Sequence, residues 1–186
     1  FRSLITWTSN DSRIILFAWS LLGSFYCLIA YFSFKFFYSF IKNKELDFKN
    51  RLLWLLFLIP VFAFSFTNYN LSDFDMGVCG VFHEGIFYVR YYYFVGIVSL
   101  LLIVFFSSRE YKKAQENFKS QIIFLTWGVG IFMFIFFVLG FLASYLVGKG
   151  IMKDFSLDQY SLFGMPIFLG ILAYLIVRHQ IFGIRL

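Results

Sequence analysis

Charged residues, prolines and cysteines are all scarce in this sequence of 186 residues. Only 14% of the residues are charged and 61% are hydrophobic, compared with about 45–50% hydrophobic in a soluble domain. So little polar surface excludes a water-soluble fold. Two prolines exclude collagen-like and proline-rich disordered chains, and two cysteines exclude a disulfide framework. The mean hydropathy of +0.80 indicates an integral membrane protein.

The sequence also lacks the motifs of membrane enzymes. Its histidines are His83 and His179, and His83-Glu84 is not followed by the second histidine of an H-E-x-x-H zinc site. There is no G-x-S-x-G nucleophile elbow and no phosphate-cradling Walker sequence. We therefore expect no catalytic residue, no cofactor and no metal in this segment.

Apolar runs dominate what is present. A spanning helix needs about 20 apolar residues to cross ~30 Å of hydrocarbon. Because the runs are continuously apolar and do not alternate with polar residues, they predict helices. The expected fold is one all-α polytopic membrane domain over residues 1–186. Its last residues, 178–186, are expected to begin a cytoplasmic signalling linker. Its five spans are expected at about 14–41, 52–69, 86–106, 122–147 and 160–177.

Lysine and arginine are unevenly distributed between the two ends of this expected bundle. Eleven lie at one end: Lys35, Lys42, Lys44, Lys49, Arg51, Arg109, Lys112, Lys113, Lys119, Arg178 and Arg185. Five lie at the other: Arg2, Arg13, Arg90, Lys149 and Lys153. Because cytoplasmic loops carry the excess, the N-terminus is expected outside and the C-terminus inside, in a multi-pass protein of the plasma (inner) membrane. The net charge of +6 then reflects topology, and we expect the lipid bilayer, not nucleic acid, as a partner.

The connection over residues 68–85 is the most polar outward segment. It carries side chains of metal-binding type, namely Asp73, Asp75, Cys79, His83 and Glu84. No spacing among them matches a known metal site, so a solvated loop is favoured.

Arg90 and several tyrosines follow this loop. Tyr88 and Tyr92 share a face of the expected helix, at the depth where aromatic belts form. A belt with a snorkelling Arg90 is the favoured interpretation. The alternative is an outward-opening ligand pocket lined by Tyr88, Tyr92, Arg90 and Glu84, in which Arg90 pairs with Glu84 or with an anionic ligand.

Small residues predict where helices pack closely. Gly140, Ser144 and Gly148 recur at four-residue intervals, which permits close approach of two backbones. Pro60 lies midway along the second run, where the loss of a backbone hydrogen bond predicts a kink. A further small-residue face lies on the first run, formed by Ser20, Ser24 and Cys27.

The C-terminal sequence is Ala173-Tyr-Leu-Ile-Val-Arg-His-Gln-Ile-Phe-Gly-Ile184. It resembles the end of the N-terminal seven-transmembrane sensor region of bacterial histidine kinases, which often closes with A-Y-x-I-x-R-Y-R-L-F-D-I. His179, Gln180 and Gly183 depart from the aromatic, basic and acidic positions of that pattern. The basic segment 108–121 and the charged linker after residues 31–37 look like the same family. The matching residues are Ala173, Tyr174, Ile176, Arg178, Phe182 and Ile184.

This resemblance implies that the chain holds the last five of seven helices, with two helices before Phe1. It also implies a sensory input domain of a two-component sensor histidine kinase. Such a domain relays a stimulus through its last helix to a cytoplasmic kinase or nucleotide cyclase domain in the same chain, with a homodimer as one arrangement. The signal would leave the membrane through Arg178, Phe182 and Gly183.

Two other interpretations stay open. A transport or scaffold subunit of a membrane complex, such as a permease fragment, would place polar groups deep within a span or show inverted repeats, and the sequence shows neither. A fragment of a eukaryotic receptor would use the N-glycosylation sequons at Asn10 and Asn70, which both fall on the expected outer side.

Overall fold

The computed structural model describes residues 11–71, 74–75, 80–81, 84–85, 87–152 and 156–179, and these are mostly helical. A π-helix, η1 (Phe87–Tyr92), precedes α5 (Tyr93–Tyr111), and a 3₁₀-helix, η2 (Tyr160–Phe163), precedes α8 (Gly164–His179). The all-α prediction is confirmed, with one addition, a two-stranded antiparallel hairpin in which Phe74 pairs with Val81. The elements are α2 (Ser12–Ser20), α3 (Leu22–Lys42), α4 (Phe48–Phe64), β1 (Phe74–Asp75), β2 (Gly80–Val81), η1 (Phe87–Tyr92), α5 (Tyr93–Tyr111), α6 (Glu116–Gly148), α7 (Ser156–Gln159), η2 (Tyr160–Phe163) and α8 (Gly164–His179).

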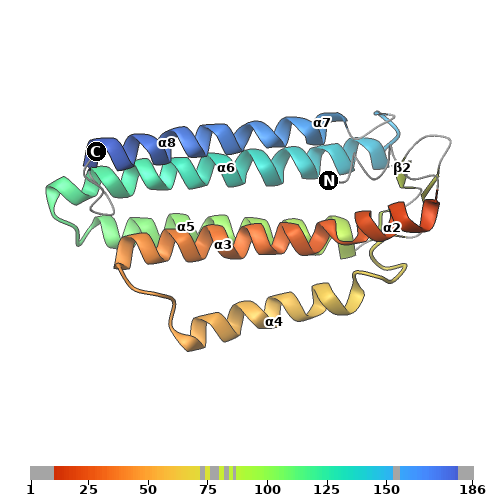
Figure 1. Ribbon diagram of the computed structural model, residues 1–186, viewed down its shortest axis with the longest axis horizontal. Coiled ribbons are helices and arrows are strands. Elements are labelled where there is room, and N and C mark those ends of the chain that lie inside the picture. Colours follow the sequence, from red (N-terminus) through yellow and green to blue (C-terminus); the bar gives the residue numbers. More distant parts are fainter. Residues whose placement is uncertain are drawn as a thin grey trace.

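The long helices run side by side along one axis (Figure 1). α6 packs on α5 and on α8, α3 packs on α5, and α4 packs on α3 at the margin of the bundle. The turns that follow α3 and α5 lie with the last residues of α8 at one end, which we call the basic end. The β1–β2 hairpin and α7 lie at the other, which we call the hairpin end (Figure 1).

Four helical segments are long and apolar enough to cross a membrane. They are Ser12–Lys42, Arg90–Tyr111, Phe118–Gly148 and Leu157–Val177, and they correspond to four of the five predicted runs. The first contains both α2 and α3, which meet at Leu21 with backbone angles that stay helical (φ −74°, ψ −17°). The length and composition of these helices support a protein that lies in a membrane.

α4 is the fifth apolar run, and it is shorter than the other four. Its 17 residues extend ~26 Å at 1.5 Å per residue, against ~30 Å of hydrocarbon. The helix begins at Phe48 and ends at Phe64. The chain turns after Phe64, and the Thr67 hydroxyl donates to the Phe64 carbonyl at 2.8 Å. Pro60 lies inside the helix, and the kink expected there stays a prediction. One stripe of α4 faces the bundle and buries Trp54, Leu58 and Val61.

Aromatic rings fill the space between α3, α5 and α6. Tyr26 of α3 meets Phe136 of α6 edge to face, with ring centroids 5.2 Å apart. Phe37 of α3 meets Phe106 of α5 in the same way, at 6.4 Å. Each such pair contributes about 0.5–1.5 kcal/mol beyond the apolar area that it buries. The rings therefore provide specific packing between helices. In lipid, apolar burial alone does not favour one helix partner over another.

The small-residue ladder on α6 contacts α5 at two of its three positions. A Cβ added at Gly140 would lie 3.1 Å from the hydroxyl oxygen of Tyr93, and the Ser144 hydroxyl lies 3.2 Å from the same oxygen. Gly148, the last residue of α6, has nothing within 4 Å of an added Cβ. The contacts of this ladder with Tyr93 are therefore made at Gly140 and Ser144.

The connection expected over residues 107–121 is largely helical. α5 continues to Tyr111 and α6 begins at Glu116, which leaves only four residues between them. Hydropathy marks where the chain leaves the hydrocarbon, but Glu, Lys, Gln and Arg continue a helix readily in water. The extra turn of α5 brings Glu110 within 2.7 Å of the Lys42 ammonium, which joins the ends of α3 and α5.

Gly23 allows α3 to approach the start of α5 closely. A Cβ added at Gly23 would lie 2.0 Å from the ring of Tyr92. Because the Tyr92 side chain is fully buried, the ring has no free space into which it can move. Gly130 on α6 provides a contrast, since nothing lies within 4 Å of a Cβ added there.

We expect Gly23→Ala to lower the free energy of unfolding by about 1–3 kcal/mol, the usual cost of overpacking a core. Gly130→Ala should leave it unchanged or raise it by up to about 1 kcal/mol, because alanine favours a helix over glycine. Thermal unfolding in detergent micelles compares the two variants. Equal shifts of the midpoint for both would contradict the close approach of α3 and Tyr92.

Candidate functional site

The residues predicted to line an outer ligand pocket differ in their surroundings. Arg90 is exposed, whereas Tyr92 is fully buried. Glu84 forms an isolated antiparallel bridge with Leu71, and the backbone of Tyr88 belongs to η1. The structure therefore places Tyr92 in the packed interior and Arg90 at the surface, and a pocket shared by all four residues stays a prediction.

Several other predicted residues lie outside the described part of the chain. Asp73, Cys79 and His83 of the outer loop do so, as do Phe182 and Gly183 of the expected signal exit. Arg178 belongs to α8, which continues to His179. Within the described residues, no three side chains of the His, Cys, Asp and Glu types lie close enough together to hold a metal ion.

A buried polar cluster lies at the hairpin end, where α2, α4 and η1 meet. We call it the Asn70 cluster, and it consists of Ser20, Ser24, Ser65, Asn70 and Tyr92. The Asn70 amide nitrogen donates to the carbonyls of Ser65 at 2.8 Å and Ser20 at 3.3 Å. Its amide oxygen accepts from the Tyr92 hydroxyl at 3.1 Å. The hydroxyl oxygens of Ser24 and Ser65 lie 3.3 Å apart.

Local backbone structure holds Asn70 in this place. The chain turns after α4, and the Asn70 N–H donates to the Thr67 carbonyl at 2.9 Å. The Gly85 N–H then donates to the Asn70 carbonyl at 2.7 Å, which ties the turn to the segment just before η1. Any side chain at Gly85 is excluded, because an added Cβ would lie 1.9 Å from the Tyr69 carbonyl oxygen.

The Asn70 cluster joins three parts of the chain that are far apart in sequence. Asn70 follows α4, Ser20 ends α2, and Tyr92 is the last residue of η1. Within the described residues, no buried side-chain nitrogen or oxygen lacks a hydrogen-bond partner. A satisfied network of this kind fixes one arrangement of the helices. The full burial of Asn70 also argues against its use as a glycosylation site, because an acceptor asparagine must be accessible.

A cleft of about 210 Å³ opens beside the Asn70 cluster. Ser20 and Ser65 belong both to the cluster and to the lining of this cleft, so the cluster forms its floor. The rings of Phe17 and Phe66 stack with centroids 5.3 Å apart and form one wall. Arg13, whose side chain is exposed, is also part of the lining. We call this space the Arg13 cleft.

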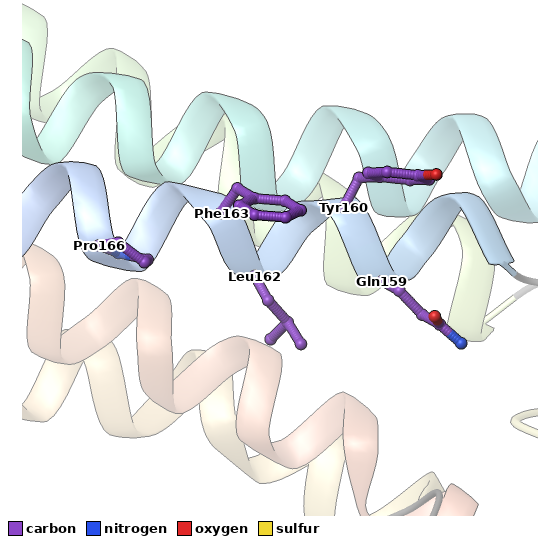
Figure 2. A pocket seen from close by; sticks show the side chains of 5 residues that line it. All are labelled: Gln159, Tyr160, Leu162, Phe163 and Pro166. Atoms are coloured by element: carbon purple, nitrogen blue, oxygen red, sulfur yellow. The ribbon is translucent and has the colours of Figure 1, made fainter.

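A second hollow, of about 500 Å³, lies along the segment 159–166. Its side chains all come from this one segment and all are exposed. Figure 2 shows the rings of Tyr160 and Phe163 side by side and Leu162 pointing away from them. The two rings stack with centroids 6.2 Å apart. This hollow is an open surface groove, and apart from Gln159 and the Tyr160 hydroxyl its lining is apolar.

Sequence patterns identified only part of the Asn70 cluster. Ser20 and Ser24 were expected on one packed face of the first run, and the structure buries both. In the sequence, Asn70 is recognisable only as part of an N-glycosylation sequon, and no pattern indicates that Ser65 is buried in a polar cluster. The position of Asn70 at the end of an apolar run could have indicated a polar cluster. A polar residue at such a position is either solvated or hydrogen-bonded to other polar groups of the protein.

We expect Asn70→Ala to lower the free energy of unfolding by about 2–4 kcal/mol, because it leaves several buried polar groups without a partner at about 1–3 kcal/mol each. Asn68→Ala, two residues away at an exposed position, is the matched control and should change stability by less than about 0.5 kcal/mol. Thermal unfolding in micelles measures both. An Asn70→Ala variant as stable as the control would rule out a structural role for the cluster.

Comparison with known proteins does not add to this geometry. A scan against protein-family models gave no match, and searches of curated proteins and of solved structures found no similar protein. The resemblance to sensor regions of histidine kinases therefore stays a prediction from the sequence.

Proposed function

We propose that this chain is the membrane-embedded input domain of a signal-transduction protein, a two-component sensor histidine kinase, and itself performs no catalysis. The observation that carries the proposal is the packing of the last helix. α8 lies along α6, with Phe168 stacked on Phe132 at 5.8 Å and Tyr174 against Phe124 at 5.2 Å. The helix continues without a break to His179. A shift of α6 would therefore move the residues that lead out of the bundle.

Five spans, an outward N-terminus and a cytoplasmic C-terminus complete the proposed topology. α4 supports the fifth span because it runs alongside the other helices (Figure 1) and carries exposed apolar residues such as Leu55, Ile59 and Phe62. The basic turns after α3 and α5 lie at the same end as the last residues of α8. The positive-inside rule assigns that end to the cytoplasm, in the plasma membrane.

The proposed mechanism is a change of packing between two arrangements of the bundle. A stimulus at the hairpin end shifts the population only if it binds one arrangement better than the other. The Asn70 cluster joins α2, α4 and η1 at that end. Because η1 packs on α5 and α5 packs on α6, a change at the cluster would displace α5 and then α6. α6 then moves α8 and the cytoplasmic kinase or cyclase domain that we expect after it.

A scaffold subunit of a membrane complex is the second candidate. It is favoured by the outward faces of α4 and α8, where exposed apolar side chains such as Leu56 and Leu169 would contact either lipid or further helices. This candidate predicts that the chain copurifies with other membrane subunits and that the bundle sends no signal to a downstream domain.

The relay through α6 and α8 is tested with two glycines on α6. A Cβ at Gly128 would lie 2.9 Å from the Ile171 side chain of α8, closer than the roughly 3.5–4.0 Å at which carbon atoms pack. Gly128→Ala should displace α8 and change the autophosphorylation or cyclase output of the full-length protein by several-fold. The measurement is that output in membranes, in the presence of ATP.

Gly130→Ala is the matched control for this relay, since nothing lies within 4 Å of its Cβ. It should give the wild-type output at the wild-type expression level. An unchanged output in Gly128→Ala, with both variants folded, would contradict the relay and favour the scaffold candidate.

A further inference from the structure

We propose that the Arg13 cleft binds the head group of an anionic phospholipid whose head group carries hydroxyls, as a glycerol head group does. This binding goes beyond the proposed signalling function and does not depend on it. Three properties of the cleft carry the inference: its apolar walls, its cationic rim and its hydroxyl floor.

The walls of the Arg13 cleft are apolar and open to the surroundings of the helices. Phe17 of α2 and Phe66, just after α4, stack on one another with their rings 10° from parallel, and both are more than half exposed. Leu16 and Leu71 complete the apolar lining. An acyl chain or glycerol backbone can lie against this surface, whereas a free inorganic ion would gain nothing from it.

The rim of the cleft carries a positive charge. Arg13 is exposed, and its guanidinium forms no ion pair with any carboxylate of the described residues. The nearby Asp11 side chain accepts from the backbone N–H of Arg13 at 2.9 Å, which caps α2. Arginine is suited to a phosphate because its planar group donates two parallel hydrogen bonds. The rim therefore favours an anionic phosphate over a neutral group.

The floor of the cleft offers acceptors. The Ser20 hydroxyl donates to the Phe17 carbonyl at 2.7 Å, and the Ser65 hydroxyl donates to the Val61 carbonyl at 2.5 Å. The Ser65 oxygen is also within 3.3 Å of the Ser24 hydroxyl, from which it accepts when its own hydrogen is given to Val61. The Ser20 hydroxyl hydrogen is likewise used, so the lone pairs of the Ser20 oxygen are the ones left to accept from a ligand. A head group with its own hydroxyls supplies those donors, which favours a hydroxylated head group over a trimethylammonium one.

The size and place of the cleft fit a head group. Its volume of about 210 Å³ is smaller than the roughly 300–1,000 Å³ of sites for drug-sized ligands. The cleft lies at the hairpin end of the bundle, near the start of the Ser12–Lys42 segment, where lipid head groups would lie around a spanning helix.

Native mass spectrometry of the whole chain in detergent tests the proposal. Phosphatidylglycerol is compared with phosphatidylcholine of the same acyl chains, with glycerol 3-phosphate and with inorganic phosphate. We expect phosphatidylglycerol to bind at least tenfold more tightly than the other three. Arg13→Gln should reduce that binding about tenfold, whereas Lys149→Gln, which removes an exposed cation directly after α6 and outside the cleft, should not change it.

Each contrary outcome overturns the inference in a distinct way. Equal binding of the two lipids would show that charge and head group do not matter. Inorganic phosphate that binds as tightly as the lipid would identify a free-anion site. Equal losses in Arg13→Gln and Lys149→Gln would mean that the lipid senses net charge and not the cleft. Because none of these measurements involves signalling output, failure here leaves the proposed function separately testable.

Discussion

The absence of water from the hydrocarbon layer is the constraint on which the rest of this structure depends. Polar groups within the bundle must find partners in the protein, since the surrounding lipid offers none. The backbone meets this requirement by forming long helices. Serine side chains meet it by donating hydrogen bonds to backbone carbonyls of their own helix. Ser99, for example, donates to the Val95 carbonyl one turn earlier at 2.7 Å. Throughout the described residues no buried side-chain nitrogen or oxygen is left unpaired.

The two ends of the bundle meet the same constraint by different means. At the basic end, an ion pair between Lys42 and the largely buried Glu110 joins α3 to α5. At the hairpin end, the neutral Asn70 cluster joins α2, α4 and η1. A neutral cluster avoids the cost of removing a charge from water, and it leaves a cleft with polar acceptors beside it. The hairpin end thus combines satisfied polar groups with the Arg13 cleft that we propose as a lipid site, whereas α8 ends at the basic end.

Periodicity and hydropathy predicted the helical class and four of the spans, because both depend on the composition of runs of about 20 residues. The ends of the helices were less predictable from the sequence. α5 and α6 both include charged residues, and a hydropathy profile predicts a loop at such residues. The Asn70 cluster was not predictable as a unit. It depends on a turn that brings Asn70 to Ser20, 50 positions away, and no local pattern encodes such a contact. The regular spacing of small residues on α6 continues to Gly148, where nothing lies within 4 Å of an added Cβ.

The central claim is that these helices thread a membrane with the basic end in the cytoplasm. Site-specific cysteine labelling tests it, in a Cys27→Ala, Cys79→Ser background that carries either Lys112→Cys or Lys149→Cys, both at exposed positions. The account predicts that a membrane-impermeant maleimide labels position 149 in intact cells and labels position 112 only after the membrane is permeabilised. Labelling of position 112 from outside, or of both positions equally in intact cells, would contradict it.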